Sequence, residues 1–117
     1  MRELERIQKR GNLNKVYASD GPGVGGASHN YTILYGGVPL LEINFQKGGR
    51  DEPDSELGVI DPDLLEIVRD RLTAFAAGPF SSPETEEALT HVEKALEALN
   101  TRVQDRTTRG VMGKHEK

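Results

Sequence analysis

The spacing of hydrophobic positions changes about halfway along this chain. In the first half, apolar residues form three short runs, at positions 16–18, 31–35 and 38–45, and turn-forming residues separate the runs. The last run ends in an alternation of apolar and polar positions, and the apolar ones are Leu41, Ile43 and Phe45. Such alternation is typical of a strand with one buried face, so the pattern predicts a small antiparallel sheet within residues 12–50.

Turn-forming residues mark the connections in this half of the chain. Gly36 and Gly37 predict a two-residue hairpin turn, because glycine readily adopts the positive φ angles that such turns need. Residues 20–26 and 47–58 are rich in glycine, proline or charge, and they predict loops. Residues 1–11 are polar and predict either a short helix or a loose end.

The second half of the chain follows the spacing of helices. The first predicted helix has Asp61 as its N-cap and Pro62 as its first residue, and it ends at Gly78. The second begins with Ser82 as its N-cap and ends at Gly110. Apolar residues recur at spacings of three and four, and they are Leu64, Leu65, Val68, Leu72 and Phe75 in the first helix and Leu89, Val92, Leu96, Leu99 and Val103 in the second.

A short link joins the two predicted helices, so they must pack against each other as an antiparallel hairpin. A lone hairpin leaves one side of its apolar seam in water, and the seam therefore needs the sheet or a second copy of the chain as cover. Residues 1–117 are expected to form one domain, with a sheet part at 12–50 and a helical hairpin part at 58–117. The expected fold class is α+β, a small N-terminal antiparallel sheet followed by a C-terminal antiparallel helical hairpin, in an oligomer.

Composition limits what a single chain can build. Hydrophobic residues make up 35% of the sequence and aromatic residues 5%, so the expected core is thin. Such a core leaves no room for a deep active site enclosed by one chain, whereas self-association would extend it. The sequence has no cysteine, no apolar run that could span a membrane and no signal peptide, so we expect a cytoplasmic protein without disulfides.

The net charge of −4 argues against a general nucleic-acid-binding protein, but its distribution is more informative. Five basic and two acidic residues give 100–117 a charge of +3, and ten basic and seventeen acidic residues give 1–99 a charge of −7. A basic C-terminal segment on an acidic body indicates a local anionic partner. Arg102, Arg106 and Arg109 share one helix face, where they either bind phosphates or interact with the carbonyl end of the helix.

Phe75 is the last large apolar residue of the first helix, and the pattern leaves it either as a core residue or as an exposed aromatic. Antiparallel packing separates it from the arginines of its own hairpin, so it can meet them only across an interface between copies. The glycine-rich residues 21–26 lack the phosphate-binding loop motif and form either a strand connection or a segment that lines a nucleotide. The sequence predicts no catalytic residue, metal site or cofactor, and binding is favoured over catalysis.

Several stretches of the sequence resemble one family of phage proteins. They are residues 67–75, the Gly78-Pro79-Phe80 link, residues 88–96 and the arginine-rich ending from Arg102 to His115. The strand 43–46 and the segment 29–31 resemble the same family. Residues 21–117 as a whole are similar to the phage anti-Thoeris sponges, the Thoeris anti-defence protein one family. This family is said to share its helical hairpin with the anti-CBASS cyclic-nucleotide sponges.

The resemblance implies a specific function. Members of this family bind glycocyclic ADP-ribose, the messenger made by Thoeris TIR-domain enzymes, and hold it without degrading it, so that the host effector is never activated. Their pocket forms between protomers, which implies that Phe75 stacks on the adenine and that Arg102 and Arg106 bind phosphates. Thr85 stands where relatives often have an asparagine, and a hydroxyl offers fewer hydrogen bonds than an amide.

Further residues and the partners are open alternatives. Asn30 is an additional candidate ligand residue, and Arg109 and His115 either contact the ligand or order the C-terminal segment against a neighbouring copy. The resemblance implies self-association from dimer up to hexamer, cyclic di- or trinucleotides as further ligands, and no DNA, RNA or membrane partner, in the cytoplasm of the infected bacterial host. The alternatives are an enzyme that cleaves a cyclic nucleotide messenger and a homo-oligomeric phage adaptor without a small ligand.

Overall fold

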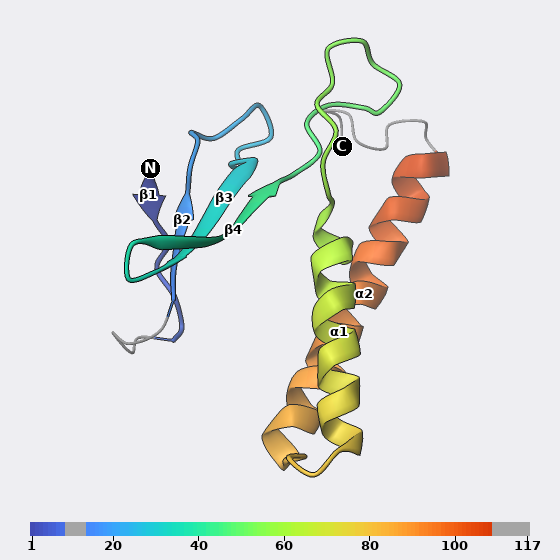
Figure 1. Ribbon diagram of the computed structural model, residues 1–117. Helices are drawn as coiled ribbons and strands as arrows, with labels where there is room; N and C mark the ends of the chain where they lie inside the picture. Colours follow the sequence, from blue (N-terminus) through green and yellow to red (C-terminus); the bar gives the residue numbers. More distant parts are fainter. Residues whose placement is uncertain (9–13, 109–117) are drawn as a thin grey trace. The chain divides into compact units, whose positions relative to one another are not determined.

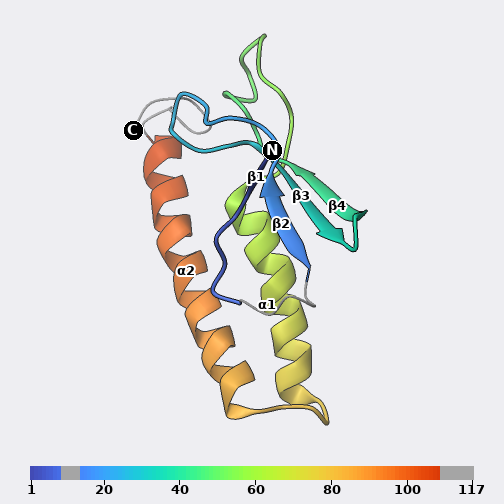
Figure 2. The same ribbon diagram turned by 90° about the vertical axis from the view of Figure 1, so that its left-hand side faces the viewer.

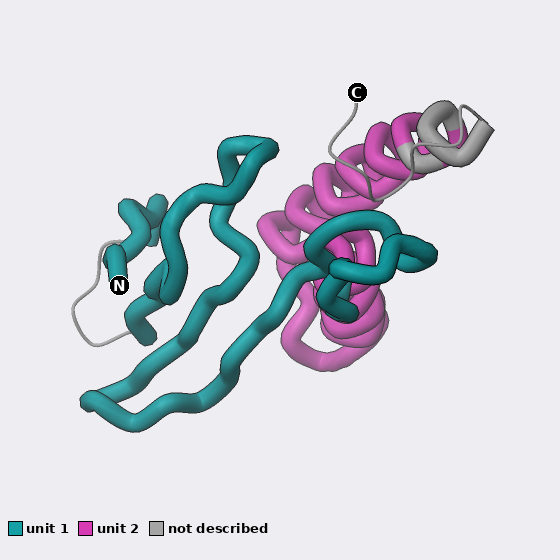
Figure 3. Tube along the Cα trace, turned by 90° about the horizontal axis from the view of Figure 1, so that it is seen from above, with its two compact units in different colours: residues 1–59, 113–115 teal, residues 60–112, 116–117 magenta. Residues whose placement is uncertain are grey.

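The structure, a computed structural model, describes residues 1–8 and 14–108 of the chain. These residues form two units, which Figure 3 colours separately: a sheet unit, Met1–Val59, and a helical unit that begins at Ile60. The predicted α+β fold, with an antiparallel sheet followed by two helices, is confirmed. The predicted helix end at Gly110, together with Arg109 and His115, lies outside the described residues.

The sheet unit contains a 4-stranded antiparallel sheet in which the strands follow one another in sequence order (Figure 1). The predicted two-residue turn between the last two strands is confirmed. Gly36 and Gly37 have φ angles of +55° and +81°, in the left-handed region that favours glycine. The strands are β1 (Arg2–Glu3), β2 (Lys15–Ala18), β3 (Asn30–Tyr35) and β4 (Val38–Asn44).

The first and last strands differ from the sequence-based expectation. Arg2 and Glu3 form β1 opposite β2, and not the helix or loose end that their polar neighbours predict. A strand of two residues is too short to show a period, so its pairing with β2 decides its conformation. Ile43 is half-buried as predicted, but Leu41, on the same face of β4, is 49% exposed, so the alternation does not give β4 one continuous buried face.

The helical unit consists of α1 (Asp61–Ala77) and α2 (Pro83–Thr108), which lie side by side and antiparallel (Figures 1 and 2). The predicted hairpin is therefore confirmed, and α1 ends at Gly78 as expected. Neither helix, within the described residues, is long and apolar enough to cross a membrane. The predicted apolar seam is half-buried at the α2 positions whose side chains are described, Leu89, Val92, Leu96 and Leu99.

The first helix begins one residue earlier than predicted. Ile60, and not Asp61, is the N-cap, and Asp61 takes the place of Pro62 as the first helical residue. The carboxylate of Asp63 accepts a hydrogen bond of 2.9 Å from the Ile60 N–H. This bond satisfies a backbone donor where the extended chain turns into the helix. A side chain of the first turn therefore makes a capping hydrogen bond, which the apolar side chain of Ile60 cannot make.

The core is thin, as the composition predicts. Among the described residues, Ala18 is the only buried apolar one, and no large side chain is fully buried. No residue of α1 is buried, and its apolar Ile67 and Val68 are 60% and 40% exposed. The helical unit therefore keeps much of its apolar surface in contact with water.

A hydrogen-bonded loop precedes the helical unit. The side-chain amide of Gln46 accepts a hydrogen bond from the Gly58 N–H at 3.2 Å and donates one to the Gly48 carbonyl oxygen at 2.9 Å. Gly58 thus lies against the backbone of the strand end. A Cβ atom on Gly58 would lie 2.5 Å from the carbonyl carbon of Phe45 and 2.6 Å from the Gln46 nitrogen, closer than real Cβ atoms approach other atoms.

We predict that Gly58→Ala destabilises the sheet unit, because backbone atoms cannot move away from the added methyl group as a flexible side chain could. Overpacking of this kind costs about 1–3 kcal/mol. The tyrosines, Tyr17, Tyr31 and Tyr35, all belong to the sheet unit, so tyrosine fluorescence during urea unfolding reports on it. Gly25→Ala is the matched control, since no atom lies within 4 Å of its Cβ position, and equal unfolding midpoints for the two variants would contradict the prediction.

Candidate functional site

Phe75, the predicted stacking residue, lies in the last turn of α1 and is 43% exposed. The guanidinium carbon of Arg71 lies over its ring, 5.4 Å from the ring centroid, in a cation–π contact. The two residues are four positions apart and share one face of the helix. A half-exposed aromatic ring beside a positive charge is suited to stack on a planar base of an anionic ligand.

The predicted phosphate ligands lie on and after α2. Arg102 is exposed, and within the described part of the chain it forms no ion pair. Arg106 belongs to α2, but its side chain lies outside what the structure describes, as does the whole of Arg109.

One hairpin does not bring Phe75 and Arg102 together. The register of the two helices follows from the ion pair between Arg69 and Glu93, which measures 3.0 Å. This register places Phe75 level with Glu87, and Arg102 lies 15 residues further along α2. At the rise of an α-helix that separation is about 22 Å, so the two groups lie towards opposite ends of the hairpin.

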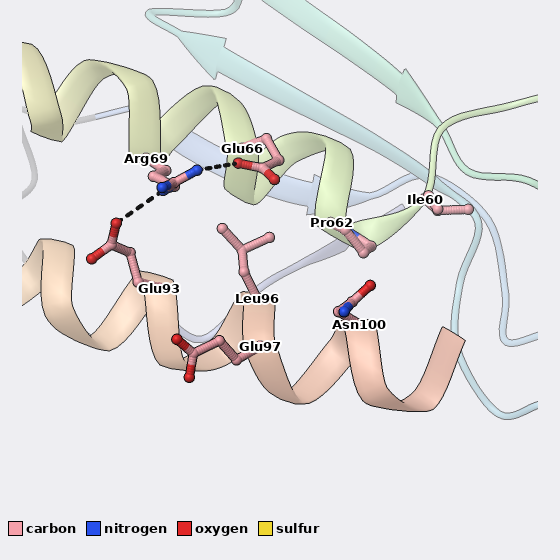
Figure 4. A pocket seen from close by; sticks show the side chains of 8 residues that line it. All are labelled: Ile60, Pro62, Glu66, Arg69, Glu93, Leu96, Glu97 and Asn100. Atoms are coloured by element: carbon pink, nitrogen blue, oxygen red, sulfur yellow. Dashed lines mark hydrogen bonds and ion pairs between the residues drawn. The ribbon is translucent and has the colours of Figure 1, made fainter. Parts of the chain in front are cut away.

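A groove of about 470 Å³ lies between α1 and α2 (Figure 4). Arg69 bridges the helices there: it lies 3.0 Å from a Glu93 oxygen and 3.5 Å from a Glu66 oxygen. The hydrogen bond to Glu93, followed by that to Glu66, raises the pKa of Arg69. Leu96 projects between the helices, and the full lining consists of Ile60, Pro62, Glu66, Arg69, Glu93, Leu96, Glu97 and Asn100.

This groove is acidic, because its lining contains three glutamates and one arginine. An anionic ligand would be repelled there, so the groove does not suit the phosphates that the arginines are predicted to bind. The groove could not be predicted from the sequence, because its residues come from two helices whose register no local pattern reveals. The i, i+3 spacing of Glu66 and Arg69 was the only signal that the sequence offered for it.

Thr85, another predicted ligand residue, takes part in the N-terminal cap of α2. Its N–H donates to Ser82 Oγ at 3.1 Å, and its hydroxyl lies 3.0 Å from the same oxygen. Ser82 is thus the cap that the sequence predicts. Thr85 is half-buried and belongs to the same end of the hairpin as Phe75, whereas Arg102 belongs to the other end.

Asn30 is the one described candidate of the sheet unit, and it follows a loop that Asp20 closes. The carboxylate of Asp20 accepts hydrogen bonds from the Asn30 N–H at 3.0 Å and from the His29 N–H at 3.1 Å. The bond from Asn30, helped by that from His29, holds the pKa of Asp20 below its ordinary value. The side-chain amide of Asn30 donates to the side-chain oxygen of Asn44, so it is already paired within the sheet.

Asp20 is not among the residues predicted from the sequence. Its place directly before Gly21 was a usable signal, because aspartate side chains often accept hydrogen bonds from backbone N–H groups at turns. Within the described residues, no group of histidine, aspartate and glutamate side chains is arranged to hold a metal ion. His91 is exposed and lies 3.8 Å from Glu87 on the same helix.

No family model matches the chain. The chain is similar to a protein named Thoeris anti-defense 1 from Bacillus phage SBSphiJ7, with 39% identity over 95 residues. The match covers 81% of this chain and 66% of that relative, so the chain spans just under two thirds of the relative's length.

We predict that Asp20→Asn destabilises the sheet unit at neutral pH and makes its stability less sensitive to acid. A carboxyl with a lowered folded pKa stabilises the fold above its ordinary value of 3.8, and this stabilisation is lost as the pH falls through the lowered value. Thermal unfolding followed by tyrosine fluorescence, at about pH 7 and about pH 3, measures both effects. Asp51→Asn, at an exposed loop position, is the matched control for the lost charge. An equal loss of stability on acidification in the parent and in Asp20→Asn would contradict the prediction.

Proposed function

Since the chain belongs to the Thoeris anti-defense 1 family, we propose that it is a phage protein that acts against Thoeris defence in infected bacteria. It acts as a sponge: it binds glycocyclic ADP-ribose, the messenger of Thoeris TIR-domain enzymes, and holds it intact, so that the effector is never activated. The observation that supports this proposal most directly is the half-exposed Phe75 ring, with a guanidinium group over it.

The chemistry of the ligand matches the groups that the hairpin exposes. Adenine is planar, and stacking on an aromatic ring contributes about 1–3 kcal/mol per base. The diphosphate accepts charge-assisted, bidentate hydrogen bonds from guanidinium groups, which is the role proposed for Arg102 and Arg106. Nanomolar affinity corresponds to about 12 kcal/mol, so these contacts suffice only when the site is preformed and water is excluded from it.

The distance between the aromatic and the arginine requires a second copy of the chain. Phe75 and Arg102 lie about 22 Å apart along one hairpin, which is more than a single small nucleotide spans. Two hairpins packed antiparallel would place the Phe75 end of one against the Arg102 end of the other. Such packing would also cover the exposed Ile67 and Val68 of α1. We therefore propose that the pocket forms between protomers, in an assembly from dimer to hexamer.

A sponge needs tight binding and slow release, and not the cleavage of a bond. Stacking, charge and exclusion of water supply tight binding and slow release without a nucleophile. Thr85 contributes through its hydroxyl, which lies 3.0 Å from the Ser82 cap oxygen, and it offers the ligand fewer hydrogen bonds than an amide would. This difference is expected to change the preference among cyclic ADP-ribose isomers and cyclic di- or trinucleotides.

We predict that the protein captures glycocyclic ADP-ribose and releases it unchanged when it is denatured. The purified protein is mixed with a substoichiometric amount of messenger and filtered, the retained protein is heated, and both fractions are analysed by chromatography. Intact messenger that appears only after heating is the expected result. An altered product would identify an enzyme, and free messenger in the first filtrate would favour an adaptor without a small ligand; either outcome rejects the sponge.

We predict that Phe75→Ala and Arg102→Ala each weaken binding of the messenger at least about tenfold, because one removes a stacking surface and the other a charge-assisted hydrogen bond. Calorimetric titration measures the affinity, and the circular-dichroism signal of the helices verifies the fold. Tyr35→Ala removes an exposed aromatic of the sheet unit, and Arg69→Ala removes a neutralised arginine. These controls are expected to bind like the parent. A Phe75 or Arg102 variant with parental affinity would show that the pocket lies elsewhere.

A further inference from the structure

Arg71 is surrounded by apolar side chains on its own face of α1. Within the described part of the chain, its guanidinium contacts the Phe75 ring and forms no ion pair. Arg69, two positions away and therefore on the far side of the helix, is neutralised by two glutamates. The residues three and four positions from Arg71 are Ile67, Val68, Ala74 and Phe75.

An interface on this face of α1 would have to bury the charge of Arg71. Val68 and Phe75, on either side of Arg71 along the helix, are 40% and 43% exposed and form the apolar surface that a second copy would cover. Covering it would remove the Arg71 guanidinium from water into apolar surroundings. A buried charge without a partner is strongly unfavourable, and no carboxylate on this face of α1 can supply that partner. The interface therefore needs an anion there, from a bound ligand or from the second copy.

We infer that Arg71 is a further ligand-binding residue, which contacts a phosphate group of the nucleotide whose base stacks on Phe75. The inference rests on the proposed function, because the messenger that the interface encloses carries the required negative charge. Arg71 lies over one face of the Phe75 ring, and the inference requires the base to stack on the opposite face. In this arrangement it orients the ring and adds a positive charge next to the base, at the end of the hairpin that is remote from Arg102 of the same chain.

Calorimetric titration of the full chain with glycocyclic ADP-ribose, at low and at high salt, tests this role. Arg71→Gln is expected to weaken binding roughly 10-fold to 100-fold at low salt, the range for a lost charge-assisted hydrogen bond. The loss should shrink at high salt, because salt screens the phosphate contact in the parent. Arg71→Lys keeps the charge and should recover part of the affinity. Arg69→Gln is the matched control on the same helix and should bind within about twofold of the parent, since its charge is already neutralised.

Each outcome separates this inference from the proposed function. If the parent binds the messenger and Arg71→Gln binds equally well, Arg71 is no ligand residue, although the sponge function stands. If Arg71→Gln loses affinity by the same factor at both salt concentrations and Arg71→Lys recovers none of it, the residue only positions the ring, and the phosphate contact is rejected. If the parent itself does not bind, the proposed function and the inference both fail. The helical circular-dichroism signal shows that each variant is folded.

Discussion

A hairpin of two helices has a line of contact but no interior, and the rest of this molecule depends on that constraint. The seam between α1 and α2 is only half-buried, and no residue of α1 is buried. Apolar and charged side chains that a larger domain would enclose are therefore presented to the outside. The same exposure that makes the single chain a thin structure leaves Phe75 and its neighbours available for a second copy and for a ligand.

The charged residues that the structure describes divide the hairpin into an acidic groove between the helices and an outer surface with unpaired arginines. Arg69 lies between Glu66 and Glu93, which neutralise its charge. The groove between the helices is still acidic, because its lining contains three glutamates and one arginine. Arg71 and Arg102 have no such partners among the described residues, and their charges act on whatever approaches the outer surface. The arginines of this protein therefore differ in function through the carboxylates that surround them, while their intrinsic chemistry is the same.

Much of the fold could be predicted from the sequence, because its local signals are strong. The glycine pair at 36–37, the helix end at Gly78 and the Ser82 cap each need a particular residue type at one position. The errors fall where a contact outweighs a local signal. The short strand β1 exists through its pairing with β2, and the cap of α1 shifts to Ile60 because Asp63 reaches back to it. Leu41 is exposed although Ile43 on the same face of β4 is half-buried, because burial depends on what covers that face and alternation does not reveal it.

The candidate site shows the same division. The sequence by itself determined which residues are aromatic or cationic on the two helices, that the helices are antiparallel, and that Phe75 and the arginines are apart on one chain. Only the tertiary structure decided the register, which the ion pair between Arg69 and Glu93 marks, and with it the separation of about 22 Å. It also decided that Arg71 lies over the Phe75 ring without a carboxylate partner, while Arg69 has two. The physical reason is that a charge acts on its neighbours in space, and those neighbours are known only once the helices are packed together.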